Sequence, residues 1–335
     1  MSNLRDVAEH AGVSISTASR ILDNKGRTSA ANREAVLAAA KLLNYRPNAL
    51  AKSLKSGATH MIALIIPDIQ NPYLPQIVRG AEDEARSNGY CMILCNTDES
   101  INVEQECISV LRNRWIDGII VSSMQQNSDH LRALLDDSFP LVLIARFFGD
   151  NFDAVGIDNA AAVYNAIQYL HQLGNRRIAI ALGNTALNVY ADRFAGYQHA
   201  IKDIGQPYDE QYILREKDGP ESIIEQTVKL CSSENCPDAV LATNDTKALA
   251  VMRGLSICGK HIPEDVAVMG IDDIFFDKLV SPSLTTIHQP LYEIGKKAVQ
   301  KLLAQIEANR NGQEYIRSIE LLRTTIIERE STRRR

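Results

Sequence analysis

The sequence predicts an all-α N-terminal unit followed by an α/β body made of two doubly wound parallel sheets. A chain of 335 residues exceeds what one hydrophobic core usually serves, so two or three domains are expected. Residues 1–60 hold nine Lys and Arg against four Asp and Glu, whereas the remainder holds 27 against 37. From Met61 onward, short apolar runs alternate with helical segments. A basic head on an acidic body is typical of a nucleic-acid-binding module joined to a domain with another task.

Two short helices are predicted on either side of Gly12. Apolar residues recur at helical spacing before it, at Leu4, Val7, Ala8 and Ala11. Glycine readily takes the left-handed conformation that ends a helix, so the first helix should stop there. Ser14 then caps a second helix from about Ile15 to Asp23, because its hydroxyl can accept from an unpaired backbone N–H. The residues expected to face inward on this helix are Ala18, Ile21 and Leu22, with Val13 nearby.

The second helix carries a polar stripe on its opposite face, formed by Ser16, Thr17 and Arg20. Two helices joined at a tight turn, with such a stripe on the second, form the helix-turn-helix layout. In that layout the second helix enters the major groove of DNA with its first residues at the base edges.

A third helix is predicted to begin after Ser29, which caps it, and to run to about Leu43. Its inward residues are expected to be Val36, Ala40 and Leu43. It ends at Arg46-Pro47, because the residue before a proline is disfavoured in the helical region. Residues 48–57 have helical propensity but form too short a segment to be helical alone in water, so they should fold when something packs against them.

Runs typical of buried strands recur through the rest of the chain. They cover 61–67, 90–96, 118–122, 140–145, 177–182, 238–242 and 266–271. Strands that are apolar on both faces and separated by helices predict parallel sheets covered by helices. About six strands per half indicate two lobes, and ligands of such sheets bind at the C-terminal strand ends. The segment 317–329 alternates like one final strand.

Several common classes of protein are disfavoured. No apolar run is long enough to span a membrane, and the N-terminus lacks the apolar core of a signal peptide, so a cytoplasmic protein is expected. The six cysteines include no C-x-x-C pair, which favours buried reduced thiols over a metal or redox site. No G-x-S-x-G, phosphate-binding loop or H-E-x-x-H motif occurs. We therefore expect no enzyme, no cofactor and no metal.

Distinctive motifs lie in both parts of the chain. In the head they are residues 4–14 (LRDVAEHAGVS), 17–22 (TASRIL) and 44–54 (NYRPNALAKSL). In the body they are 71–73 (NPY), 193–197 (RFAGY), 242–245 (ATND), 270–273 (GIDD) and 281–286 (SPSLTT). The chain closely resembles the lactose-repressor/galactose-repressor (LacI/GalR) family of transcription factors over nearly its whole length, and the head motif is highly specific.

The resemblance implies a DNA-binding headpiece at 1–46, a hinge helix or linker at 47–59, and a two-lobed, periplasmic-binding-protein-like body at 60–335. It implies a transcriptional regulator, by default a repressor, whose homodimer reads a pseudo-palindromic operator in double-stranded DNA. A two-fold dimer presents the same helix twice and needs matching half-sites. A small effector in the cleft would change DNA affinity. The family default is a sugar or sugar derivative, with a nucleobase, a nucleoside or a phosphocarrier protein as alternatives.

On the recognition helix, the family's base-reading positions correspond to Ile15, Ser16 and Arg20. The Arg20 guanidinium can bond guanine O6 and N7 together, whereas Ile15 can offer only an apolar contact, for example to a thymine methyl. Phosphate contacts are expected from Thr17, Ser19, Asn24, Arg27, Ser29 and Asn32. Helix capping is an equal alternative for Ser29, and a solvated loop position is one for Arg27.

In the hinge, the resemblance implies a helix that forms only on operator DNA and contacts the minor groove through Ala51, Leu54 and Lys55. Leu54 would insert at the central base step. The free-energy cost of unstacking the bases there is offset because the bent duplex contacts more of the protein. Lys55 suits the negative potential of the minor groove. The alternative is a leucine that docks the linker on the body.

In the cleft, the resemblance implies Arg193, Asn244 and Asp272 as polar contacts to the effector. Tyr73, and either Phe147 or Phe148, could supply apolar walls for a sugar face. A guanidinium, an amide and a carboxylate suit a polyhydroxylated ligand, because each can bond vicinal hydroxyls in pairs.

Nearby positions have two interpretations each. Asp273 faces the cleft or, preferably, caps the next helix; Phe275 and Phe276 belong to the lobe core or to the cleft; Arg146 pairs with a carboxylate or touches the ligand. Helix 72–87, with Ile77, Val78 and Ala81, supplies dimer surface or belongs to the core.

A soluble sugar-binding protein is the alternative class that would share the two-lobed body. The basic head disfavours this class, because such a protein needs no nucleic-acid-binding module.

Overall fold

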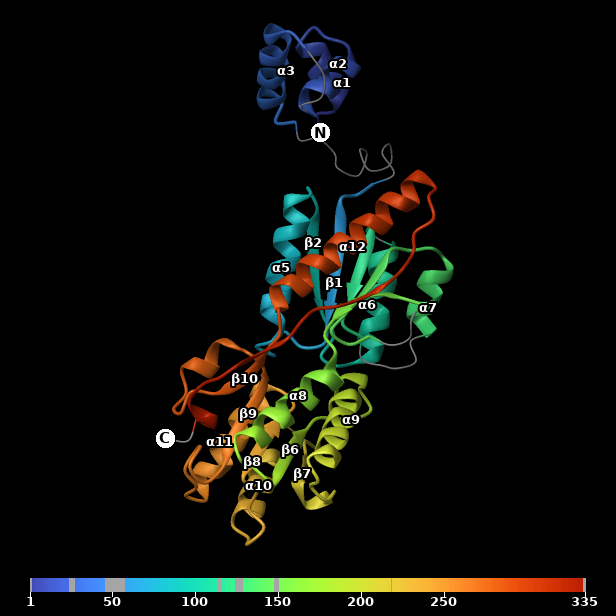
Figure 1. The fold of residues 1–335 in the computed structure, drawn as a ribbon. Coiled ribbons are helices and arrows are strands. Elements are labelled where there is room, and N and C mark those ends of the chain that lie inside the picture. Colours follow the sequence, from blue (N-terminus) through green and yellow to red (C-terminus); the bar gives the residue numbers. More distant parts are fainter. Residues whose placement is uncertain are drawn as a thin grey trace. The chain divides into compact units, whose positions relative to one another are not determined.

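The computed structural model describes residues 2–23, 28–45, 58–113, 116–123, 129–147, 151–217 and 219–333. The chain divides into two compact units, residues 1–59 and 60–335 (Figure 1). The first unit contains the three helices of the headpiece, and the second is the body. Each unit is described by itself.

The headpiece contains three helices, α1 (Leu4–His10), α2 (Ile15–Leu22) and α3 (Ala30–Leu42). Gly12 lies between the first two with φ +66°, so it takes the left-handed conformation predicted for it. Ser14 caps α2 by accepting from the Thr17 N–H at 3.1 Å, and Ser29 caps α3 by accepting from Asn32 at 3.2 Å. Both predicted caps are confirmed.

One small core joins the three headpiece helices. Its buried members are Val7, Ala8, Ala18, Ile21, Val36, Ala39 and Ala40, with Leu4, Ala11, Val13, Leu22, Leu43 and Tyr45 packed against them. Every residue predicted to face inward belongs to this set. The core is small because alanine supplies much of it, so the helices approach one another closely and present their polar faces outward.

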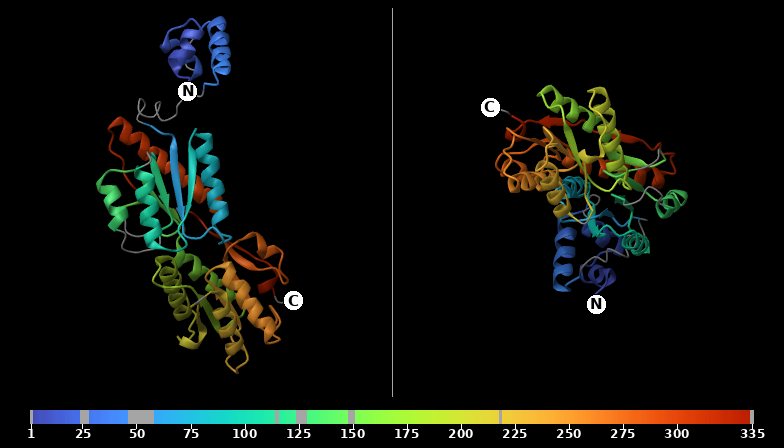
Figure 2. Two further views of the ribbon diagram at one scale, coloured as in Figure 1. Left: turned by 180° about the vertical axis from the view of Figure 1, so that it is seen from behind. Right: turned by 90° about the horizontal axis from the view of Figure 1, so that it is seen from below.

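The first lobe of the body is built on a six-stranded sheet with strand order β11-β5-β4-β3-β1-β2. Its elements are β1 (Met61–Ile66), α5 (Leu74–Ser87), β2 (Cys91–Asn96), α6 (Ile101–Asn113), β3 (Gly118–Val121), α7 (Asp129–Asp136), β4 (Leu141–Ile144), β5 (Asp153–Gly156), α12 (Leu291–Asn311) and β11 (Ile319–Leu321). Alternate residues of β1 enter different cores: Ile62 and Leu64 face α5 and α12, whereas Ala63 and Ile65 face α6 and α7. Both faces of this sheet are therefore covered (Figure 2).

The second lobe repeats this plan with strand order β12-β10-β9-β8-β6-β7. Its elements are α8 (Asn159–Gln172), β6 (Ile178–Leu182), α9 (Asn188–Asp203), η1 (Glu210–Tyr212), β7 (Ile213–Arg215), α10 (Pro220–Cys231), β8 (Ala239–Ala242), α11 (Asp245–Ile257), β9 (Ala267–Asp272), η2 (Phe275–Lys278), β10 (Thr285–His288), β12 (Thr325–Ile327) and η3 (Glu330–Thr332). Strand pairs in both sheets are parallel except β10 with β12. The prediction of two doubly wound lobes is confirmed.

The chain passes between the lobes three times, after β5, after β10 and after β11. The prediction of one strand over 317–329 is wrong, because β11 joins the first sheet and β12 joins the second. Alternation alone does not show where such a segment leaves one sheet for the other. The C-terminal segment therefore ties the two lobes together instead of extending one of them.

Helix α5 packs closely against α12 on one face of the first sheet (Figure 1). A Cβ on Gly295 would lie 2.0 Å from the Ile77 carbonyl oxygen, so glycine is required for this approach. Ile77 is fully buried and Ala81 is 1% exposed. Ile77 and Ala81 therefore belong to the core and offer no surface for a dimer. Val78 is only half-buried, so a dimer contact of this helix stays a prediction.

Candidate functional site

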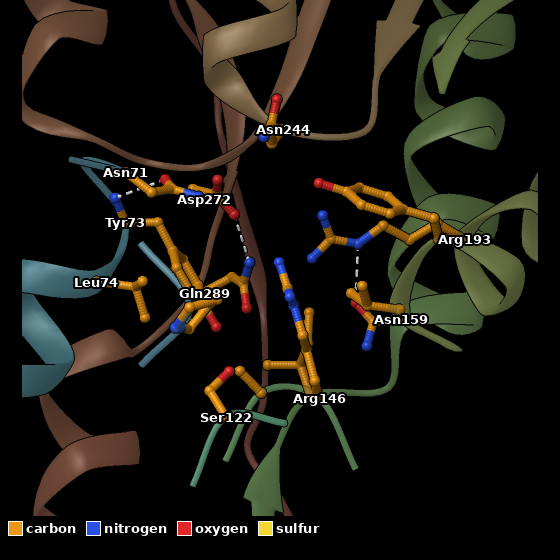
Figure 3. Close-up of a pocket in the computed structure, with 15 residues that line it drawn as sticks. Asn71, Tyr73, Leu74, Ser122, Arg146, Asn159, Arg193, Asn244, Asp272 and Gln289 are labelled. Carbon is orange, nitrogen blue, oxygen red and sulfur yellow. Dashed lines mark hydrogen bonds between the residues drawn. The ribbon is translucent and has the colours of Figure 1, made fainter. Parts of the chain in front are cut away.

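A pocket lies between the two lobes of the body (Figure 3). The first lobe and its crossing segment supply Pro67, Asn71, Tyr73, Leu74, Ser122, Ala145, Arg146 and Ile157. The second lobe and its crossing segment supply Asn159, Val189, Tyr190, Arg193, Asn244, Asp272 and Gln289. Four of the five residues predicted to contact an effector are among them, namely Tyr73, Arg193, Asn244 and Asp272.

These side chains converge because most of them follow the carboxyl ends of parallel strands. Ser122 follows β3, Arg146 follows β4, Asn244 follows β8 and Gln289 follows β10, while Asp272 ends β9. The two sheets meet the pocket with the same ends, where doubly wound sheets bind their ligands.

Arg193 is held rigidly on α9 with 5% of its surface exposed. Its Nε donates to Asn159 Oδ1 at 2.8 Å, and its Nη1 donates to the Thr243 carbonyl oxygen. Two fixed donors leave the plane of the guanidinium little freedom. The group points into the pocket (Figure 3) and is preorganised for paired hydrogen bonds to a ligand.

Asp272 is the buried carboxyl group of the pocket. Gln289 Nε2 donates to its Oδ1 at 2.6 Å, and Figure 3 shows the two side chains meeting. Burial, and then the neighbouring Asp245, raise the pKa of Asp272 to about 8, although Arg193 opposes this. Its backbone φ is +139°, a strained value for a side chain other than glycine, and such strain is concentrated at ligand sites.

Arg146 also faces the pocket, next to Ala145, whose φ is +58°. The Arg146 guanidinium pairs with Glu99 at 3.3 Å. This arginine therefore contacts a carboxylate and also lines the pocket, and its contact with a ligand stays a prediction. With Arg193 it gives the cavity two cationic donors.

Aromatic rings close the pocket on two sides. Burial raises the pKa of the Tyr73 hydroxyl, so that group stays neutral at ordinary pH. Tyr190 packs on Gly183, where a Cβ would lie 2.5 Å from the ring, and the Lys247 ammonium lies 5.0 Å from the centre of the same ring. Lys247 is in turn paired with Glu216 at 2.7 Å. The ring of Tyr190 is thereby fixed in place.

Three expectations about the pocket are wrong. Phe147 does not line it: its ring packs under Gly156 among the partly buried residues of the first-lobe core. Asp273 caps no helix, because η2 has no side-chain cap; its carboxylate instead pairs with His288 and Arg329. Phe275 and Phe276 are not core residues, since they are 61% and 49% exposed.

The sequence reasoning also missed pocket residues, above all Asn71, Asn159, Tyr190 and Gln289. Asn71 stands in the NPY motif, and Gln289 comes directly after a strand, so strand-end position was an available signal for both. Asn159 also follows a strand, β5, closely, whereas Tyr190 carries no such signal because it reaches the pocket from within α9.

The headpiece exposes the side chains predicted to meet DNA bases. Ile15 is 45% exposed, and Ser16 and Arg20 are exposed on the same helix, α2. Ser29 and Asn32 are exposed and Thr17 and Ser19 half-buried, and the Thr17 hydroxyl lies 2.8 Å from that of Ser14. The other predicted DNA contacts, Asn24, Arg27, Ala51, Leu54 and Lys55, lie outside the described residues.

Three further observations concern only the part of the chain that the structure describes. No group of three or more His, Cys, Asp or Glu side chains there could hold a metal ion. All six cysteines lie within it and all are free. No described helix is long and apolar enough to cross a membrane.

A helix-turn-helix head joined to a two-lobed body with a polar interlobe pocket defines a class, the ligand-regulated DNA-binding proteins. Residues 3–48 match the family model of bacterial regulatory proteins, lacI family, and residues 167–332 match a periplasmic binding protein-like domain. The chain belongs to the LacI family. It is a DNA-binding transcriptional regulator and not an enzyme.

Relatives agree along the whole chain. A ribose operon repressor from Halalkalibacterium halodurans is 34% identical and aligns over 92% of this chain and 91% of its own. The structure of a transcriptional regulator CelR–cellobiose complex superposes with a TM-score of 0.74 at 28% identity, covering 99% of this chain and 100% of that one. A lac repressor dimer bound to operator and the anti-inducer ONPF gives a TM-score of 0.86 at 25% identity, covering 99% of each chain.

Proposed function

We propose that this protein is a cytoplasmic homodimeric repressor that binds a pseudo-palindromic operator and changes its operator affinity when a small sugar enters the interlobe pocket. The observation that carries the proposal is the convergence of Arg193, Asn244, Asp272 and Gln289 in one pocket of a chain that also carries a helix-turn-helix head. The ribose operon repressor among its relatives makes ribose the first effector to test.

The chemistry of the pocket suits a polyhydroxylated ligand. The guanidinium of Arg193 can donate two parallel bonds to adjacent hydroxyls, and the carboxyl group of Asp272 can, when protonated, donate to one hydroxyl and accept from another. The rings of Tyr73 and Tyr190 offer apolar surface to the C–H face of a sugar. Because the donors and acceptors come from both lobes, a bound sugar would favour one arrangement of the lobes over others.

DNA recognition is assigned to the exposed face of α2 and to the hinge. In our proposal Ile15, Ser16 and Arg20 contact base edges, because they are exposed at the start and middle of the second helix. Thr17, Ser19, Asn24, Arg27, Ser29 and Asn32 contact phosphates. The family hinge role assigns Ala51, Leu54 and Lys55 to the minor groove at the operator centre.

The effector part of the proposal is tested by the thermal stability of the full-length protein and by release of operator DNA. Ribose, cellobiose and a nucleoside are each added across a concentration series. A ligand at 100 times its Kd should stabilise the body by about 2.7 kcal/mol, and the same ligand should change operator affinity. Ribose is expected to do both. A response to the nucleoside alone would make a nucleoside, and not a sugar, the effector. A response to none of the three ligands would refute the proposed sugar effector.

Leu54→Ala is expected to weaken binding to the operator much more than binding to unrelated DNA. The wedge acts only where the duplex can be unstacked and bent at the half-site junction, whereas non-specific binding depends mainly on phosphate contacts. Binding of wild type and variant to operator and random duplexes is compared at one salt concentration. Leu42→Ala, at an exposed leucine of the headpiece, is the control. Equal losses on both duplexes would contradict the role of Leu54.

A further inference from the structure

The short helix η2, which follows the Asp272–Asp273 turn, contains a buried carboxyl group to which no described group donates a hydrogen bond. Asp277 belongs to η2, and none of its surface is exposed. Within the described part of the chain, neither of its carboxyl oxygens has a hydrogen-bond partner. The nearest cationic group is Arg329, whose Nη1 lies 4.0 Å from Asp277 Oδ2. A charged carboxylate in this position would lose its hydration without replacement, which is strongly unfavourable.

The neighbouring acid, Asp245, is in the opposite situation. It is also fully buried, but Thr286 Oγ1 donates to its Oδ1 at 2.6 Å, and the Ile274 N–H donates to its Oδ2 at 3.1 Å. Asp245 thus has the donors that a carboxylate needs, and its side chain interacts with that of Asp277. Both groups have only acceptor oxygens when ionised, so a hydrogen bond between them requires a proton on one of them. Two adjacent buried carboxyl groups cannot both be ionised at low cost, so such a pair holds a proton between them.

We propose that Asp277 carries this proton and donates a hydrogen bond to the Asp245 carboxylate, and that this hydrogen bond positions the Asp272 turn of the effector pocket. The positioning role rests on the function proposed above. The proton-sharing pair rests on the burial of both carboxyl groups, on the missing donor at Asp277 and on the two donors to Asp245.

The link to the pocket runs through Asp245. This residue follows the pocket residue Asn244, and its carboxylate holds the backbone of Ile274, just past Asp272 and Asp273. Those two aspartates have φ values of +139° and +62°, so the turn is strained and needs contacts that hold it in place. A Cβ on Gly270 would lie 2.0 Å from Asp245 Oδ1, which shows how tightly the carboxylate fits against β9.

The other charged groups around the pair have assigned partners. Asp273 Oδ1 accepts from Arg329 at 2.5 Å, and its Oδ2 lies 2.9 Å from the ring nitrogen of His288. Asp272 accepts from Gln289. Because Arg329 is engaged with Asp273, its charge is shared and neutralises Asp277 only in part.

The sign of the pH dependence follows. Burial, and then the neighbouring Asp245, raise the pKa of Asp277 to about 9, although Arg329 opposes this. An unfolded aspartate titrates near pH 3.9. Between these values the native state holds one proton more at Asp277 than the unfolded chain does, so the contribution of this group to stability is greatest at low pH and is lost as pH rises toward 9. One such proton makes the unfolding constant rise about tenfold per pH unit.

The test compares full-length wild type with Asp277→Asn and Asp277→Ala. An asparagine amide can donate to Asp245 as the protonated acid does, but it does not titrate. The number of protons released on thermal unfolding is measured by calorimetry at pH 7.5 in buffers of different ionisation enthalpy, and Tm is measured from pH 6 to 9.5. Glu264→Gln, at an exposed carboxyl group of the same lobe, is the control.

Asp277→Asn is expected to release about one proton fewer than wild type and to lose less stability as pH rises, whereas the Glu264 control should match wild type. Asp277→Ala is expected to have a lower Tm at every pH, because Asp245 then loses a donor. An unchanged proton count in Asp277→Asn would overturn the proposal. So would a Tm for Asp277→Asn as low as that of Asp277→Ala at pH 6.

The positioning role is read from ribose affinity at pH 7.5. We expect Asp277→Asn to bind ribose as wild type does and Asp277→Ala to bind it at least tenfold more weakly while remaining folded. Equal ribose affinity in the two variants would overturn the positioning role. If wild type does not bind ribose, the effector assignment fails, whereas the proton count still decides whether Asp277 and Asp245 share a proton.

Discussion

Arg193→Met should abolish the response to effector while leaving operator binding intact. The substitution removes a guanidinium that is fixed by Asn159 and by the Thr243 carbonyl, and it leaves both acceptors without that donor. Hydrogen bonds to charged groups contribute about 1.5–3 kcal/mol each, so losing two of them to a sugar should lower effector affinity by at least about 100-fold. The measurement is the effector concentration that half-releases a labelled operator, together with direct binding by calorimetry.

Two further variants make this result specific. Arg253→Met removes an exposed arginine from α11 of the same lobe and should behave as wild type. Arg193→Lys keeps the charge but not the planar fork, so it should recover only part of the affinity. An Arg193→Met protein that is folded and still releases operator at the wild-type effector concentration would show that the interlobe pocket is not the effector site.

Arg20→Ala should remove most of the operator's advantage over random DNA. An arginine bonded to guanine O6 and N7 contributes about 1–3 kcal/mol of base discrimination, which is roughly 5- to 150-fold per half-site. Arg20 is exposed on α2, where such a contact can be made. Competition binding with operator and random duplexes at fixed salt measures the ratio of affinities.

Lys41→Ala is the matched control for Arg20, because it removes one exposed positive charge from the same headpiece. It should lower both affinities slightly and leave their ratio unchanged. A ratio that is also unchanged in Arg20→Ala would assign Arg20 to the phosphate backbone and not to a base.

The headpiece could be predicted in detail because its structure is set by local interactions. A cap such as Ser14 acts on a backbone group three residues away, and Gly12 ends a helix through its own φ angle. The spacing of apolar residues along α2 and α3 identified the core, since each helix buries one stripe. These signals lie within a few residues of one another, so they are complete in the sequence.

The pocket could be predicted only in part. Tyr73, Arg193, Asn244 and Asp272 were identified by their resemblance to family motifs, and the structure places all four in the lining. Phe147 was misassigned, because the direction of its ring depends on the space that Gly156 leaves in a neighbouring strand. The role of Asp273 was misassigned because its partner, Arg329, lies 56 residues away in the chain.

What the sequence determined by itself was the pattern of elements: three capped helices, two sets of buried strands and the acidic body that follows a basic head. Only the tertiary structure decided that β11 and β12 belong to different sheets, that Gln289 bonds Asp272, and that Asp277 is buried without a donor. The physical reason is the distance along the chain between the residues that interact. Caps and periodicity act along the chain, whereas strand partners, pocket contacts and buried charges depend on which distant segments share the same space.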